Sequence, residues 1–243
     1  MAIEVISYNI KYGQKLERIA DWVKAKNPMV FCLQEFPQES LGNFVPGYQE
    51  FFAASFNKNK QTYGEMIGLA GNIDLTSAFC VDLGRMSPVP FFPASGRRSA
   101  LVIAFETQNG VVVIGDAHLE WRARAGYKLD QFKQLMGSID QAFSDPEIPT
   151  ILVGDFNFSN VFSGNGLERL ALEKGYQLGN RFNTHRIFGI RHQVDYVFYK
   201  NCRVEEVRTE RINFSDHDPV LFKVTQNGEL RRHTYPGFEL LHG

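Results

Sequence analysis

The chain has 243 residues, of which 44% are hydrophobic and 22% charged, a composition typical of a globular protein with an extensive core. Its 26 Lys and Arg residues nearly balance 27 Asp and Glu residues. That balance excludes binding to nucleic acid mainly through bulk positive charge, although it leaves room for a local basic patch. No apolar run approaches the ~18 residues that span a bilayer, and three widely spaced cysteines predict neither a disulfide framework nor a zinc site.

The first half of the chain begins with an alternating segment at 3–8 that is typical of a strand. No secretory signal pattern precedes it, so we expect a cytoplasmic protein. Residues 14–26 have the apolar spacing of a helix, which Asn27-Pro28 ends, and residues 30–33 form a buried strand. Residues 37–64 are expected to be rich in loops. Strands are then predicted at 66–70 and 77–82, before a Pro-rich connector at 87–93.

The second half alternates in the same way. Strands at 100–106 and 111–114 flank Asn109-Gly110, a strong hairpin signal, and residues 127–143 have helical spacing. A strand at 149–153, a helix at 166–174 and strands at 193–199, 201–210 and 219–224 follow. With no repeat and no long linker, this order predicts one domain of the α/β or α+β class, in which helices cover a mixed sheet.

Polar side chains lie at or near the ends of several of the predicted strands, where a shared edge would bring them together. They are Asn9, Glu35, His118, Asp155, Asn157, Asp195, Asp216 and His217. Carboxylates and amides are ligands suited to Mg²⁺ or Mn²⁺, and histidines can bind an anionic oxygen or move a proton. Together these groups fit metal-assisted hydrolysis of a phosphate ester.

Taken alone, most of these residues have an ordinary structural explanation. On that explanation Asn9 would fill a turn, Glu35 would be a solvated loop carboxylate, and His118 would be a hydrogen-bonded histidine without a catalytic role. Asp195 resists that interpretation, because a carboxylate flanked by Val194 and Tyr196 is costly to bury without a partner. His217 is its natural partner.

The ordered set of motifs resembles the endonuclease/exonuclease/phosphatase superfamily of DNase I-like phosphohydrolases. The motifs are Ser7-Tyr8-Asn9, Leu33-Gln34-Glu35, His118-Leu119, Gly154-Asp155-Phe156-Asn157, Val194-Asp195-Tyr196 and Ser215-Asp216-His217. The resemblance implies a four-layer sandwich of two packed mixed β-sheets flanked by helices. It spans nearly the whole chain, so a single domain over 1–243 is expected, with 226–243 as a C-terminal extension.

The resemblance also implies a role for each residue. Glu35 resembles the principal ligand of Mg²⁺ or Mn²⁺, and Asn9 and Asp216 resemble supporting ligands. Asp155 resembles the group that activates or positions the attacking water, and Asn157 the amide that orients water and phosphate. His217 and His118 resemble the histidines that contact the scissile phosphate, with Asp195 holding His217.

The substrate is less well defined by the sequence. Arg98 and Arg191 are candidate phosphate-binding residues, and Lys58, Lys60 and Tyr63 are a candidate nucleic-acid contact. We therefore expect a monomeric phosphodiesterase that cleaves nucleic acid. The alternatives are a phosphatase or sphingomyelinase-like phosphodiesterase acting on small phosphorylated or lipid substrates, and a non-catalytic binding module on the same fold.

Overall fold

The computed structural model describes residues 2–86, 94–159, 165–187 and 189–226, and about half of them lie in strands. Three α-helices occur in these residues: α1 (Leu16–Lys26), α2 (Ala125–Ala142) and α3 (Gly166–Glu173). The strands are β1 (Ile3–Asn9), β2 (Val30–Pro37), β3 (Tyr48–Lys58), β4 (Gln61–Ala70), β5 (Leu75–Arg85), β6 (Ala94–Thr107), β7 (Gly110–His118), β8 (Thr150–Asp155), β9 (Gln177–Leu178), β10 (His185–Ile187), β11 (Ile190–His192), β12 (Asp195–Lys200), β13 (Cys202–Thr209) and β14 (Val220–Gln226). No helix in these described ranges is long and apolar enough to cross a bilayer.

The strands form two halves that the long strand β6 connects. One half has the order β13-β14-β1-β2-β4-β3, and the other contains β6-β7-β8-β12-β9 with β5 beside β6. The beginning of β6 pairs with β3 at Gly96 and Phe56, whereas its later residues pair with β5 and β7. The sheets are mixed, as predicted: β1 and β2 are parallel, β7 and β8 are parallel, and the remaining pairs are antiparallel.

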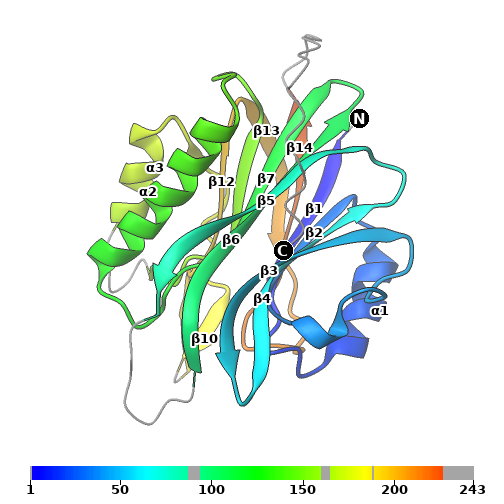
Figure 1. Cartoon of the computed structure of the whole chain (residues 1–243), viewed down its shortest axis with the longest axis vertical. Coiled ribbons are helices and arrows are strands. Elements are labelled where there is room, and N and C mark those ends of the chain that lie inside the picture. Colours follow the sequence, from blue (N-terminus) through cyan, green and yellow to red (C-terminus); the bar gives the residue numbers. More distant parts are fainter. Residues whose placement is uncertain (1, 87–93, 160–164, 188, 227–243) are drawn as a thin grey trace.

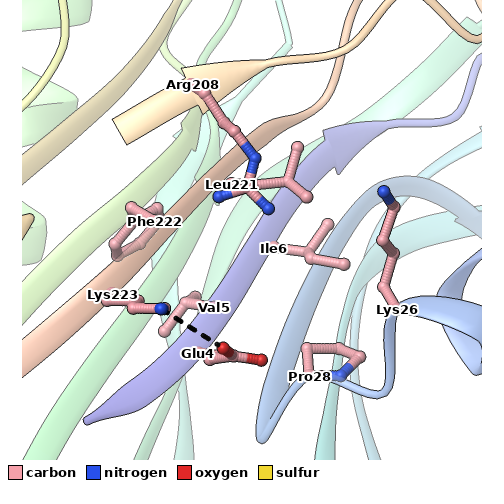
Figure 2. A pocket seen from close by; sticks show the side chains of 9 residues that line it. All are labelled: Glu4, Val5, Ile6, Lys26, Pro28, Arg208, Leu221, Phe222 and Lys223. Atoms are coloured by element: carbon pink, nitrogen blue, oxygen red, sulfur yellow. Dashed lines mark ion pairs between the residues drawn. The ribbon is translucent and has the colours of Figure 1, made fainter. Parts of the chain in front are cut away.

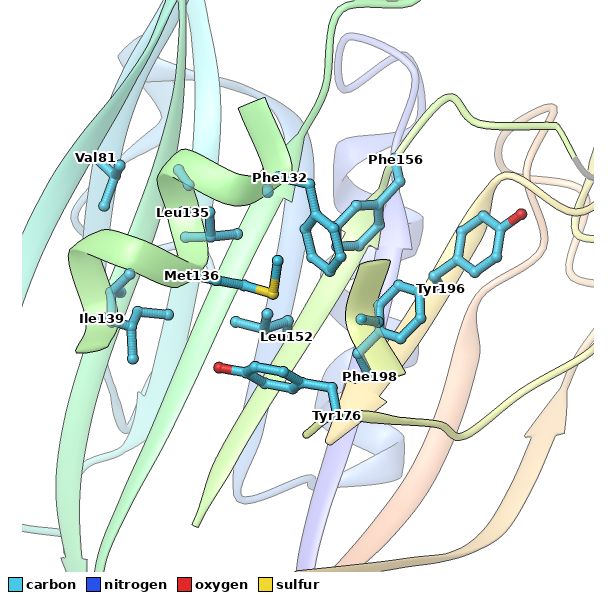
Figure 3. Close-up of a cluster of buried hydrophobic side chains, with 14 of the residues drawn as sticks. Val81, Phe132, Leu135, Met136, Ile139, Leu152, Phe156, Tyr176, Tyr196 and Phe198 are labelled. Atoms are coloured by element: carbon cyan, nitrogen blue, oxygen red, sulfur yellow. The ribbon is translucent and has the colours of Figure 1, made fainter. Parts of the chain in front are cut away.

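Three large apolar clusters hold these elements together, beside a small fourth one at the β3–β4 hairpin. One lies between the two halves of the sheet and contains Val5, Cys32, Ile103 and Ile151. A second packs α2 and α3 against the other face of β6, β7, β8 and β12. Figure 3 shows the side chains of α2 in this cluster facing those of the strands. The third packs α1 against β1 and β2, on the side of the strands opposite to α2 and α3 (Figure 1). The alternation along each strand therefore places one set of side chains between the halves and the other set under a helix.

The predicted helices and most predicted strands are confirmed, with shifted boundaries. The loop-rich prediction for 37–64 is wrong, because β3 and the beginning of β4 form a long hairpin there. Its turn is the polar tract that contains Asn59 and Lys60, which both have positive φ. The prediction failed because the apolar residues of β3 do not alternate cleanly: Phe51 and Phe52 are adjacent and both half-buried. The predicted connector at 87–93 and most of the predicted extension lie outside the described residues.

Both parallel pairs end at the same edge of the structure. Asn9 ends β1 beside Gln34 of β2, and His118 ends β7 directly opposite Asp155 of β8. The two pairs belong to different halves of the sheet, yet Asn9 donates a hydrogen bond to Asp155 across the gap (3.0 Å). The edge at which the two halves meet therefore collects polar side chains from distant parts of the sequence.

Candidate active site

One carboxylate oxygen, Oδ2 of Asp155, lies at the centre of the polar cluster. It accepts the hydrogen bond from Asn9 Nδ2 and lies 3.6 Å from His118 Nε2 and 3.7 Å from His217 Nε2. Burial raises the pKa of Asp155, the His217 cation opposes this shift, and the nearby Asp195 carboxylate adds to it. An acid with a raised pKa is a better proton acceptor, which suits a group that activates water.

Local backbone geometry holds Asp155 in place. Gly154 has φ +129°, and a Cβ at this position would lie 2.0 Å from the carbonyl oxygen of Ala117, so only glycine allows β7 and β8 to approach this closely. The other oxygen of Asp155 accepts the backbone N–H of Asn157 (2.9 Å). The amide of Asn157 donates to the carbonyl of Leu119 (3.1 Å), which ties the loop after β8 to the end of β7.

Glu35 reaches the cluster through a β-bulge. Its φ is +59°, and the register between β2 and β4 shifts by one residue between Leu33 and Phe36. Such a bulge redirects a side chain. Oε1 of Glu35 lies 3.5 Å from Asn9 Nδ2 and 3.9 Å from His118 Nε2. Burial raises the pKa of Glu35 to about 7, although the cations of Arg98 and His217 oppose this shift.

His217 lies between two carboxylates. Its Nδ1 donates to Asp195, 2.9 Å from Oδ2, and Asp195 also accepts the hydroxyl hydrogen bond of Thr184. Burial by itself would lower the pKa of His217, but Asp195 and Asp155 together raise it to about 10. His217 is therefore an imidazolium at neutral pH, with Nε2–H directed toward Asp155. The predicted partnership of Asp195 and His217 is present in the structure.

His185, which the sequence analysis did not select, stacks on His217. Their ring centroids are 4.1 Å apart with an interplanar angle of 17°, and the backbones form an isolated bridge. The hairpin β10–β11 that carries His185 is fixed to the His217 loop because the backbone N–H of Asp218 donates to the carbonyl of Thr184 (2.8 Å). No motif in the sequence indicated this contact, since β10 is only three residues long.

Neither Arg98 nor Arg191 presents its guanidinium to solvent in the way that a phosphate-binding role would require. Arg98 is 2% exposed, and its guanidinium faces His118 Nδ1 (3.2 Å) and the buried Glu120 (3.4 Å). Arg191 forms an ion pair with Asp218 and donates to the carbonyl of Asn183 (3.1 Å). Both lie near the histidines, but their donors contact protein groups.

Asp216 has charged partners of its own. Lys11 forms an ion pair with it (3.0 Å), and His185 Nε2 lies 3.9 Å away. Although burial acts in the opposite direction, the hydrogen bond from His185 and the charges of His217 and Lys11 hold the pKa of Asp216 well below its usual range. Asp216 is therefore an anion that faces the cluster from the loop before β14.

The chemistry of the donors decides which groups fit a metal ion. Asp155, Asp195 and His217 lie close enough to share one, as do His185, Asp216 and His217. Nδ1 of His217 is already bonded to Asp195, which suits this ring to binding a phosphoryl oxygen through Nε2 rather than to holding the ion. The carboxylates remain: Asp155 is buried and Glu35 is partly buried, and the two share one amide donor, Asn9. Oxygen donors of this kind fit Mg²⁺ or Mn²⁺.

Asn9 presents its nitrogen, not its oxygen, to the carboxylates. Its Oδ1 accepts the backbone N–H of Lys11 (3.0 Å), which leaves the two N–H groups of Nδ2 for Glu35 and Asp155. In this arrangement Asn9 orients the acids rather than offering an oxygen ligand.

A separate pocket lies at the opposite end of β1. It is lined by charged residues that include Lys26, Arg208 and Lys223 (Figure 2). Lys223 lies 3.8 Å from Glu4, and Lys26 and Arg208 are paired with Glu210. Because these cations already have carboxylate partners and no strand-end motif reaches them, the pocket is not the candidate active site.

Comparison with known proteins agrees with this geometry. The model of the endonuclease/exonuclease/phosphatase family matches residues 6–217, which include every motif of the cluster, so the chain belongs to this family. Members of the family are phosphoester hydrolases. A curated relative, the UPF0294 protein of Erwinia tasmaniensis, is 28% identical over 125 residues, which are 51% of this chain and 46% of the relative. The match thus spans about half the length of that protein.

Two solved structures have the same fold. TDP2 of D. rerio, complexed with a single-strand DNA product, has a TM-score of 0.71 and 14% identity, covering 93% of this chain and 99% of its own. A mannosyl-6-phosphatase of Bacteroides thetaiotaomicron has a TM-score of 0.69 and 17% identity, covering 92% and 99%. At these identities the likeness establishes the fold, which is mostly β-sheet with few helices.

Proposed function

We propose that the chain is a Mg²⁺- or Mn²⁺-dependent phosphodiesterase that cleaves nucleic acid by in-line attack of water. The observation that carries this proposal is the cluster around Asp155, where one carboxylate oxygen lies within 4 Å of Asn9, His118 and His217. A water-activating acid beside two phosphate-binding histidines is the arrangement that phosphoester hydrolysis requires.

Glu35 is the proposed principal metal ligand, with Asp216 and Asn9 in support. Burial of Glu35 beside Asp155 concentrates negative charge, which favours a divalent cation. Asn9 supports by orienting the Glu35 carboxylate, given that its oxygen is already bonded to the backbone of Lys11. When bound, the metal would neutralise charge on the phosphoryl and leaving oxygens.

The protein groups divide the remaining work. Asp155 takes a proton from the attacking water while the oxygen of that water forms a bond to phosphorus. At the same time the bond from phosphorus to the leaving ester oxygen breaks. His217, held as a cation by Asp195, binds a phosphoryl oxygen through Nε2–H, and Asn157 orients water and phosphate. These interactions strengthen as charge develops on the phosphoryl group.

A group of cations near Glu35 supports nucleic acid as the substrate. Burial lowers the pKa of Lys58, the Glu35 carboxylate opposes that shift, and the charges of Lys11 and Arg122 add to it, so both of these cations lie near Lys58. Like charges gathered beside a phosphate site favour a substrate with several phosphates. Lys58 also lies over the Tyr12 ring, with Nζ 3.3 Å from its centroid.

The arrangement of the three large apolar clusters supports a four-layer sandwich. The clusters lie between α1 and the first half of the sheet, between the two halves, and between the second half and α2 with α3. We propose that residues 1–243 form this single domain, with 226–243 as a C-terminal extension.

The first test is hydrolysis with Mg²⁺ or Mn²⁺ and an EDTA control, on plasmid DNA, single-stranded oligonucleotides, bis-p-nitrophenyl phosphate, an inositol polyphosphate and sphingomyelin. We expect EDTA-sensitive cleavage of the nucleic acids, which Glu35→Gln abolishes. Glu39→Gln, an exposed carboxylate four residues later, is the matched control and should retain activity. Turnover of only the small phosphoesters or the lipid would replace nucleic acid with that substrate class. A folded protein that cleaves nothing would contradict the enzymatic proposal and leave a binding module.

A further inference from the structure

Arg98 is buried at an unusual place for a permanent cation. It lies in β6, two residues after Gly96, where the strand leaves β3 and joins β5 and β7. Arg97 faces outward and pairs with Asp82, whereas Arg98 faces inward and is 2% exposed. Its guanidinium lies 4.9 Å from the centroid of the Phe56 ring, which also covers the edge of His118.

The partners of Arg98 determine the direction of its hydrogen bonds. Nη1 lies 3.2 Å from Nδ1 of His118, and Nε lies 3.4 Å from Oε2 of Glu120. A guanidinium can only donate, so Nδ1 of His118 must be the acceptor. In a neutral imidazole the single proton is then on Nε2.

We propose that Arg98 is a positioning residue that fixes His118 in the tautomer with its proton on Nε2, which makes His118 a hydrogen-bond donor to a phosphoryl oxygen of the substrate. This inference rests on the proposed function for the role of the donor, but the tautomer itself follows from the contact alone. Nε2 faces the reaction centre, 3.6 Å from Asp155 Oδ2 and 3.9 Å from Glu35 Oε1. With the other tautomer, a lone pair would face the anionic phosphate.

The two histidines of the site therefore differ. His217 has an acid, Asp195, behind its ring, and it is a cation. His118 has the Arg98 guanidinium behind its ring, and because that group can only donate, Nδ1 is unprotonated and the ring carries its single proton on Nε2. His118 is a neutral donor with a fixed direction, a role that suits binding of a phosphoryl oxygen better than proton transfer.

Glu120 and α2 keep Arg98 in place. Glu120 is fully buried, its Oε1 accepts the backbone N–H of Arg122 (3.0 Å), and its own backbone N–H donates to Gln131 of α2 (3.0 Å). Gln131 in turn donates to the carbonyl of Leu83 in β5 (2.9 Å). Arg98 is thus enclosed by β5, β7 and α2, and direct contact with a substrate phosphate would require these bonds to break.

The test is a two-bond ¹H–¹⁵N spectrum of the histidine rings in the metal-free protein at neutral pH, with His118→Gln to assign the resonance. We expect wild-type His118 to have an unprotonated Nδ1 and a protonated Nε2. Arg98→Met should give a mixture of tautomers or a protonated Nδ1, and Arg97→Met, the matched control, should leave the wild-type pattern unchanged. A wild-type ring protonated at Nδ1 would overturn the proposal. An Arg98→Met protein whose His118 keeps the wild-type protonation pattern would also overturn the proposal, because Asp155 and Glu35 would then hold the proton on Nε2 without Arg98.

Kinetics separate positioning from direct binding. On a substrate that the wild type cleaves, Arg98→Met should lower kcat about 10²-fold, the effect of losing one donor to a developing oxyanion, with little change in KM. A raised KM with unchanged kcat would instead indicate that Arg98 binds substrate. If Arg98→Met does not fold because Glu120 is left without its cation, the double variant Arg98→Met with Glu120→Gln removes both charges and is measured in its place. If the wild type cleaves no phosphoester, the proposed function fails, while the spectrum still decides the tautomer.

Discussion

Asp155 and Asp195 lie directly opposite each other on the antiparallel strands β8 and β12, so two like charges face one another at the end of the sheet. His217 relieves this repulsion: Nδ1 lies 2.9 Å from Asp195, and Nε2 lies 3.7 Å from Asp155. Like charges placed opposite each other destabilise a sheet. The pair is therefore tolerable because the imidazolium lies between the carboxylates, and the same cation is available to bind phosphate.

Asp195→Asn should separate the position of His217 from its charge. The amide keeps the shape of the side chain but removes the charge that holds the imidazolium, so the pKa of His217 should fall from about 10. We expect kcat to fall by about 10²- to 10⁴-fold, as for the loss of an aspartate that orients a histidine elsewhere. Steady-state rates and an NMR titration of His217 measure both effects. The control is Asp74→Asn, an exposed acid just before β5. Wild-type activity of Asp195→Asn would contradict the assigned role of His217.

Gly154→Ala should damage the site through the backbone. The new Cβ would lie 2.0 Å from the carbonyl oxygen of Ala117, and φ is +129°. Strain and overpacking together should lower the free energy of unfolding by about 3 kcal/mol or more, measured by urea denaturation. Gly137→Ala, at an exposed position of α2 where a Cβ meets no atom within 4 Å, should instead stabilise the protein by about 0.5–1 kcal/mol. Equal effects of the two substitutions would refute the close approach of β7 and β8.

Asp116 should make the protein less stable as the pH rises. It is fully buried in β7, accepts a hydrogen bond from Gln34 (2.6 Å), and burial raises its pKa to about 8. The folded state therefore keeps a proton that the unfolded chain loses above about pH 4. The stability that this acid contributes is complete below that pH and is lost as the pH rises through about 8.

Asp116→Asn removes this dependence because the amide stays neutral. Urea denaturation in EDTA at pH 5, 6, 7 and 8 should show wild type losing up to about 1.4 kcal/mol per pH unit relative to the variant. Asp130→Asn, an exposed acid of α2, should follow the wild-type curve. Parallel curves for wild type and Asp116→Asn would mean that the folded protein holds no proton on Asp116.

Lys58→Met should weaken cleavage of nucleic acid more than cleavage of a small phosphoester. If Lys58 binds a phosphate of the strand, as proposed, its removal should reduce the slope of log kcat/KM against log salt by about 1 and lower kcat/KM for an oligonucleotide at low salt. Hydrolysis of bis-p-nitrophenyl phosphate should change little. Lys174→Met, an exposed cation at the end of α3, is the control. An identical loss on both substrates would place Lys58 at the scissile phosphate and contradict its role in binding the rest of the strand.

The sequence by itself determined which residues could carry the chemistry. Asn9, Glu35, His118 and Asp155 each follow or end an apolar run, and their order along the chain was enough to indicate the family, which the match over residues 6–217 confirms. This worked because strand ends and residue types are local properties. Even the partnership of Asp195 and His217 followed from a local argument about the cost of burying a charge.

Only the tertiary structure decided which side chains contact those residues. Arg98 looks like a surface cation in the sequence, and its burial depends on β6 crossing from one half of the sheet to the other, a path set by pairing with β3, β5 and β7. His185 reaches His217 through a hairpin of three-residue strands, too short to leave a periodic pattern. The charge and tautomer of each histidine depend on such partners, because electrostatic interactions follow distance in space and burial, neither of which is written in local sequence.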